Sequence, residues 1–179
     1  MAISLRLWSA LQALEARRPA EAWELVRPYL DRGSSDFFVL GVAAEAQACR
    51  DAELVRRAAA ASPPTFPGTA ELEFMRRLDE TGRRRREAAA RIVRQAARFL
   101  REGDVQRAQV FVNRARALDD GAAEVLFYRG MLAAAEKRKA AAKLCFVEAL
   151  RADRAFDRAR RALENLLSGR PLASIAGLL

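Results

Sequence analysis

The side chains of this chain that could do chemistry are mostly arginines, because its 179 residues include no histidine. Histidine is the usual general base of enzymes and the commonest metal ligand. The two cysteines, Cys49 and Cys145, lie far apart in apolar helical patterns, which predicts two reduced, buried thiols. They are too few to make a zinc site. We therefore expect no catalysis, no metal and no cofactor.

The charge of the chain is strongly basic and unevenly spread. A formal net charge of +9 results from 32 basic and 23 acidic residues. Residues 1–62 carry eight of each kind, whereas residues 69–101 carry ten arginines and five acids. In that second segment four arginines are consecutive and four more recur at helical spacing. The predicted basic patch consists of Arg83, Arg84, Arg85, Arg86, Arg91, Arg94, Arg98 and Arg101.

Two interpretations of this basic patch remain open. On a helical wheel the last four arginines lie nearly opposite the apolar residues of the same stretch, which is typical of the solvent face of an amphipathic helix. If a helix instead begins near Gly82, the consecutive arginines stand at its positive end, where a bound anion would offset their repulsion. An acidic partner protein would supply that anion, and so would nucleic acid bound to residues 76–101. Nucleic acid is the less favoured partner, because no aromatic residues interleave with the arginines to stack on bases.

The composition predicts an all-α protein. Apolar residues make up 51% of the chain, which excludes wholesale disorder. Alanine, the strongest helix former, recurs in almost every segment, and the alternating pattern of strands is absent. No stretch approaches the ~20 apolar residues of a membrane span, and charged residues interrupt the start of the chain where a signal peptide would be apolar. We expect a cytoplasmic protein with no membrane span.

Two adjacent stretches, residues 89–122 and 123–156, align with each other without a gap. Five positions match: a small residue in a first helix, a small residue that opens a second helix, a larger apolar residue four places later, an alanine three places after that, and an acidic residue in the turn. The matched pairs are Ala96 and Gly130, Ala108 and Ala142, Val112 and Phe146, Ala115 and Ala149, and Asp119 and Asp153. Small residues let two helix axes approach, and the larger one fills the space between successive repeats.

A helix–turn–helix period of about 34 residues, as these matched pairs define it, resembles the tetratricopeptide repeat (TPR) family. The resemblance implies a TPR-like α-solenoid of helix–turn–helix pairs, closed by a C-terminal capping helix over residues 155–167. It is looser toward the N-terminus. There, residues 37–64 fit after one residue is dropped, and the first 33 residues fit only in part, with Pro28 predicted to kink their second helix.

These patterns divide the chain into four parts. Residues 1–62 are predicted to hold divergent N-terminal TPR-like repeats, and residues 89–168 the C-terminal repeats with the capping helix. Residues 63–88 form a linker with a basic helix. Residues 169–179 form an apolar tail that could dock in the chain's own groove, mediate self-association by entering the groove of a second copy, or bind a partner.

The linker region itself is expected to contain a break and then a helix. The sequence SPPTFPG over residues 62–68 cannot be helical throughout. A helix capped by Thr69 is then predicted to place Leu72, Met75 and Leu78 on one apolar face. This helix either ends at Gly82 or continues to Leu100.

The resemblance to TPR proteins also implies a binding groove. In that family the second, fifth, ninth and twelfth residues of each repeat line the concave side. The groove residues implied here are Phe38, Val42, Val93, Ala97, Leu100, Phe127, Met131 and Ala134. They are apolar, so the clamp that some TPR domains use for a terminal carboxylate is absent, and a helical or extended apolar segment is the expected guest. The alternative is that some of these residues are core.

Taken as a resemblance, this organisation implies a non-catalytic protein–protein interaction module. Its partner would be another protein, bound in the groove and selected for acidity by the arginines at the margin. Small cytoplasmic TPR proteins of this size include chaperones of bacterial secretion systems and assembly factors of large complexes, so adaptor, scaffold and chaperone are the roles we expect. The alternative is a nucleic-acid-associated protein.

Overall fold

The computed structural model describes residues 3–48 and 51–169, and over these residues it consists of α-helices and turns with no strand. The predicted all-α class is therefore confirmed for the described part of the chain. The chain divides into two units, Met1–Arg84 and Arg85–Leu179. The division falls inside the segment that the sequence assigns to a linker.

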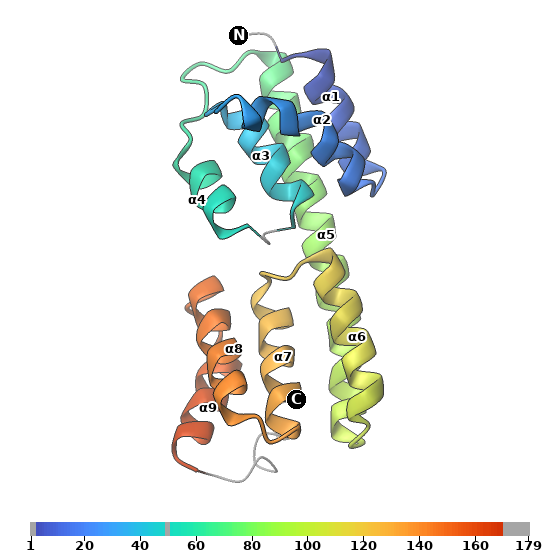
Figure 1. Cartoon of the computed structure of the whole chain (residues 1–179), viewed down its shortest axis with the longest axis vertical. Helices are drawn as coiled ribbons and strands as arrows, with labels where there is room; N and C mark the ends of the chain where they lie inside the picture. The colour runs from blue at the N-terminus through green and yellow to red at the C-terminus, as the bar shows by residue number, and fades with distance from the viewer. Residues whose placement is uncertain (1–2, 49–50, 170–179) are drawn as a thin grey trace. The chain divides into compact units, whose positions relative to one another are not determined.

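Unit 1 contains four helices and the first part of a fifth (Figure 1). Three of the helix starts are fixed by side chains that accept hydrogen bonds from backbone N–H groups. Ser4, Asp36 and Asp51 cap the first, third and fourth helices in this way. The helices are α1 (Leu5–Glu15), α2 (Pro19–Asp31), α3 (Phe37–Ala46), α4 (Ala52–Ala60) and α5 (Thr69–Arg101), of which α5 continues into unit 2.

An aromatic cluster forms the centre of unit 1. Phe74 of α5 is fully buried, and its ring meets the rings of Trp8 and Phe38 edge to face at centroid distances of 5.1 and 5.3 Å. The apolar face predicted for this helix is therefore partly wrong. Leu72 is 53% exposed, because α5 turns Phe74 and, one turn later, Leu78 toward the core.

The structure bears on three local points of the sequence analysis, at residues 62–68, Gly82 and Pro28. Residues 62–68 are not helical, as their composition predicts. Gly82 lies inside α5, which begins at Thr69 and runs on to Arg101. Helix α2 continues past Pro28 to Asp31, less than one turn further, so Pro28 stands near the end of the helix.

Unit 2 is built around α7. Its helices are the last part of α5, α6 (Val105–Leu118), α7 (Ala123–Ala135), α8 (Lys139–Ala152) and α9 (Asp157–Leu167). Helix α7 lies between α6 and α8, and α9 packs on α8 (Figure 1). Nine of the 13 residues of α7 are buried, so this helix is enclosed on almost every side, as expected for a helix with apolar residues all round.

The period of the sequence recurs in the backbone of unit 2. Helix α6 begins at Val105 and α8 begins one period later at Lys139, and the two helices have the same length. The turns before them match as well. Gly103 has φ 77° and Lys137, again one period later, has φ 61°, so both turns reverse through a left-handed residue. The sequence period therefore specifies helix boundaries as well as packing positions.

A close helix crossing occurs at Gly130 of α7. A Cβ atom built on Gly130 would lie 2.4 Å from Cε1 of Phe146, a ring on α8 that is fully buried. In the preceding period the same two positions hold Ala96 and Val112, both fully buried in the same core. Where the first position is alanine, the second is the smaller valine. Where the first position is glycine, the second is the larger phenylalanine, as close packing requires.

We expect Gly130→Ala to destabilise unit 2 by about 1–3 kcal/mol, although alanine has the better helix propensity. The added methyl group overlaps the Phe146 ring, which is fully buried. Gly41→Ala in α3 is the matched control, because its Cβ would meet only the methyl end of Leu78 at 3.0 Å. That variant should stay within about 0.5 kcal/mol of the original. Urea denaturation measures both, and equal effects would contradict the close crossing.

Candidate functional site

The residues predicted to line an apolar groove are core residues in the structure. Val42, Val93 and Phe127 are fully buried, and Leu100 is partly buried against the core of unit 2. Phe38, Ala97, Met131 and Ala134 are buried as well. The prediction that these eight side chains form an open apolar wall is therefore wrong. Their burial agrees with the alternative, that they belong to the core.

Neighbouring side chains explain why the wall is closed. The ring of Phe127 lies 5.8 Å from the ring of Phe146 on α8 and 5.5 Å from that of Phe156, just before α9. The guanidinium of Arg158, on α9, covers the same Phe127 ring at 5.6 Å. Helices α8 and α9 therefore occupy the apolar side of α7 that a guest segment would otherwise use.

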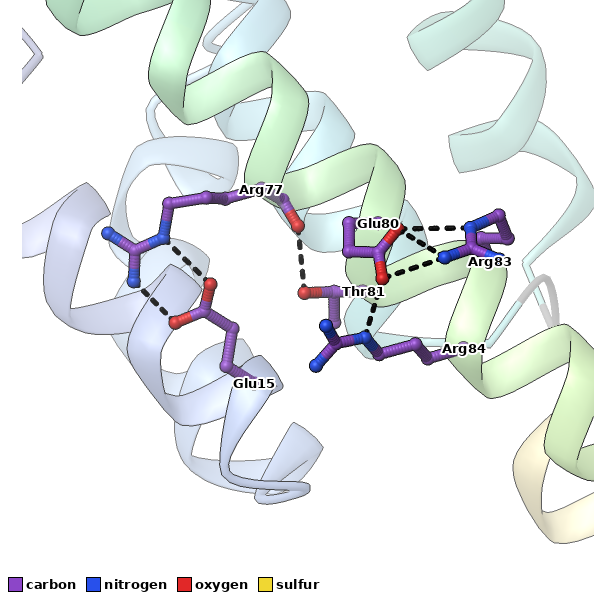
Figure 2. Close-up of polar contacts among 6 residues, drawn as sticks. All are labelled: Glu15, Arg77, Glu80, Thr81, Arg83 and Arg84. Atoms are coloured by element: carbon purple, nitrogen blue, oxygen red, sulfur yellow. Dashed lines mark hydrogen bonds and ion pairs between the residues drawn. The ribbon is translucent and has the colours of Figure 1, made fainter.

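The first arginines of the predicted basic patch bind a carboxylate on their own helix. Arg83 and Arg84 both donate to Glu80, at 2.7 and 2.6 Å (Figure 2). These hydrogen bonds hold the pKa of the Glu80 carboxyl below its ordinary value, with the bond from Arg83 the largest cause. Arg77, three residues before Glu80, donates from Nε to Glu15 of α1 at 2.8 Å, and this bond ties α5 to α1 within unit 1 (Figure 2).

Arg85 makes the most buried ion pair of those that the structure describes. Its guanidinium lies 2.9 Å from Asp119 Oδ2, and the side chains of the two residues are only 15% and 3% exposed. Arg85 also donates to the carbonyl of Leu118 at 2.9 Å, and Asp119 accepts from the backbone N–H of Gly121 at 3.1 Å. Arg85 therefore fastens α5 to the turn between α6 and α7.

The position of the four consecutive arginines within α5 shows whether they need a bound anion. Because α5 begins at Thr69, Arg83 to Arg86 lie in the middle of a helix and not at its positive end. No bound anion is needed to offset their charge at a helix start. The structure thus removes the one feature of the run that favoured an external anion.

We expect Asp119→Ala to lower the free energy of unfolding by about 3 kcal/mol, because it leaves the buried Arg85 guanidinium without its carboxylate. Asp153→Ala is the matched control, one period later. Asp153 makes the same kind of turn hydrogen bond, to Ala155 N–H at 2.9 Å, but it is exposed. Its loss should cost less than about 1 kcal/mol. Thermal or urea unfolding of the two variants measures the difference, and a similar loss in both would show that the ion pair contributes little.

The later arginines of the patch diverge in their surroundings. Arg98 lies 2.9 Å from Glu102, and Arg101 donates to the carbonyl of Ala97 at 3.3 Å. Arg86 and Arg91 are exposed. Arg94 differs from the others, because it reaches across to α7, where its Nε lies 3.6 Å from Glu124. The eight arginines therefore do not form one uniform basic surface.

Three helices of unit 2 share a polar surface, which we call the α5–α7–α9 face. Glu124 of α7 lies between Arg94 of α5 and Arg158 of α9, at 3.6 and 3.1 Å. The Arg158 guanidinium rests over the rings of Phe127 and Phe156, at 5.6 and 5.2 Å. Stacking of this kind holds a guanidinium by its flat face and leaves its N–H edge able to bind a carboxylate.

A buried tyrosine belongs to the same face. Tyr128 is 1% exposed, and this burial raises the pKa of its hydroxyl. The charge of Arg158 acts against that rise, the charge of Glu124 adds to it, and the charge of Arg101 opposes it more weakly. The hydroxyl therefore stays protonated near neutral pH.

The remaining predictions concern thiols, metals, membranes and the tail. Cys145 is a free, buried thiol, as predicted, and its burial raises its pKa, while Cys49 lies outside the described residues. Among the described residues no group of side chains suits a metal ion, and no helix there is long and apolar enough to cross a membrane. Of the predicted apolar tail, residues 170–179 lie outside the described part.

Sequence reasoning missed the two carboxylates on which this region depends. From the sequence, Asp119 is expected to be an ordinary turn residue, and Glu124 a polar residue at an otherwise apolar groove. A signal for both exists, since Arg85 and Asp119 are separated by one period, as Glu124 and Arg158 are, and extending the alignment in both directions pairs them. In comparisons with known proteins, no family model, no curated protein and no solved structure matches the chain.

Proposed function

We propose that this chain is a non-catalytic protein–protein interaction module, and that unit 2 binds an acidic segment of a partner protein on the α5–α7–α9 face. The observation that carries the proposal is the array of Arg94, Glu124 and Arg158 across three helices. Adaptor, scaffold and chaperone are the roles that such a surface serves. We place the protein in the cytoplasm.

The repeated geometry of unit 2 supports a TPR-like arrangement. Helix boundaries and left-handed turn residues recur with the period of the sequence, and α7 and α8 form consecutive neighbours. In a stack of this kind, the first helix of each pair lies on one common side. The contacts of Glu124 with both Arg94 and Arg158 fit that order, because they connect α5, α7 and α9 while α6 and α8 are skipped.

The chemistry of the face favours a carboxylate-bearing guest. Two arginines share one glutamate, so the array keeps an excess positive charge. Arg94 is 62% exposed at its side chain and Arg158 is 37% exposed, so solvent and a partner can reach both. A glutamate or aspartate of a partner would compete for the N–H edge of Arg158 without disturbing its packing on the rings. The apolar groove is no longer part of the proposal, because its residues are core.

A defined acidic probe tests the proposal. Fluorescence anisotropy of a labelled 20-residue polyglutamate should report binding to the full chain that weakens as salt is added. The double variant Arg94→Gln with Arg158→Gln should bind about tenfold more weakly. The double variant Arg107→Gln with Arg160→Gln is the control. It removes the same charge from exposed arginines that pair with Asp104 and Asp157 close by in sequence, and it should bind within about twofold of the original.

Nucleic acid is the competing outcome of the same measurement. A labelled single-stranded oligonucleotide of equal charge is titrated beside polyglutamate. If it binds more tightly, and if that binding is insensitive to the changes at Arg94 and Arg158, the protein-partner proposal fails. Equal weakening of polyglutamate binding by both double variants would also overturn it, because attraction to net charge alone would then explain the result.

A further inference from the structure

Unit 2 contains a second basic site, a cleft between α6, α7 and α8 with a volume of about 210 Å³. Three guanidiniums line it. Arg116 comes from α6, Arg129 from α7, and Arg138 from the position that caps α8. Leu132 and Cys145 are among the apolar side chains that line the same cleft. None of these arginines belongs to the α5–α7–α9 face or to the basic patch predicted from the sequence.

The charges of this cleft are only partly neutralised. One oxygen of Asp120 accepts both from Arg116 Nε at 2.9 Å and from Arg129 at 3.3 Å. Arg138 donates from Nε to Glu136 at 2.7 Å. Three guanidiniums therefore meet two carboxylates, and each guanidinium has five N–H donors to offer. Arg129 and Arg138 also act on the Cys145 thiol by charge, as does Arg116, while the exposed Glu148 acts in the opposite sense.

The start of α8 adds to the positive potential. Asp104 caps α6 and accepts the N–H of Arg107 at 2.9 Å, whereas Arg138 stands one period later at the cap of α8 and makes no such bond. No acidic residue lies in the first turn of α8, and Lys139 is its first residue. The start of α8 therefore adds positive charge beside the cleft, although Glu136 pairs with Arg138.

The geometry points to a binding site for a phosphate-class oxyanion in this cleft. Arginines that converge from three directions match the several oxygens of a tetrahedral anion, and a guanidinium can bind two of them at once. The excess positive charge of the cleft favours an anion, and Arg129 and Arg138 both have further N–H donors to offer it. The cleft has room for such a group and is too small for most drug-sized ligands. This site goes beyond the proposed function and does not depend on it.

Inorganic phosphate is the first probe. Titrated into the full chain at constant ionic strength, it should raise the melting temperature in a saturable way, and sodium chloride of equal ionic strength should not. Arg129→Gln and Arg138→Gln should each weaken phosphate binding by about tenfold, since each removes a charge-assisted hydrogen bond. Arg151→Gln, which removes an exposed arginine from the last turn of α8, should leave the affinity unchanged. The same rise with chloride, or the same affinity in all three variants, overturns the inference.

A second measurement needs no variant. Because Cys145 lines the cleft, bound phosphate should slow its alkylation by iodoacetamide severalfold, with half of the effect at the phosphate concentration that half-saturates the thermal shift. Peptide mapping separates Cys145 from Cys49. An alkylation rate of Cys145 that does not respond to phosphate contradicts the site.

Titration with O-phosphoserine identifies the source of the anion. Tighter binding than that of phosphate assigns a phosphorylated side chain, and weaker binding assigns a free phosphate compound.

Discussion

Unit 2 depends on the close approach of α7 and α8, where the ring of Phe146 occupies the space that a Cβ atom on Gly130 would need. Interiors as dense as those of proteins leave no slack at such a crossing. The crossing sets how α8 lies on α7 and allows the Phe127 ring to meet Phe146 and Phe156. The apolar residues of α7 are thereby used for folding and are lost to binding.

A consequence of this packing is that the buried apolar side chains of α7 are not available to bind a partner. With Phe127 and Met131 buried, the proposed recognition by unit 2 uses arginines, which are held in place by different means in different places. Arg85 is locked into a turn by Asp119, and Arg158 rests on two rings while it shares Glu124 with Arg94. The same residue type thus serves stability in the first case and an accessible surface in the second. Burial and the nearest carboxylate decide which.

The class of fold and the repeat of unit 2 could be predicted from the sequence because both depend on local patterns. Alanine-rich amphipathic stretches specify helices, and the register of the repeat marks the positions where helices cross. The groove could not be predicted in the same way, since a spacing that would bring Val93 and Phe127 to one side of a TPR-like stack does not say whether another helix covers them. Arg85 and Asp119 are separated by one period, but Arg85 lies before the two aligned stretches, and the period alone does not say which of the many pairs at that separation form a buried contact. Gly82 stays undecided in the sequence for a similar reason, because its helix is sustained by tertiary packing on both sides of it.

The central claim is that unit 2 recognises partners with the polar α5–α7–α9 face while its apolar core stays closed. The most direct measurement is an NMR titration of the full chain, labelled at the arginine Nε and methionine methyl positions, with unlabelled polyglutamate. The account predicts that the Nε–H signals of Arg94 and Arg158 shift progressively and that the methyl signal of Met131 does not move. A large shift of the Met131 methyl with no change at the two arginines would contradict it, because the guest would then be entering an apolar groove.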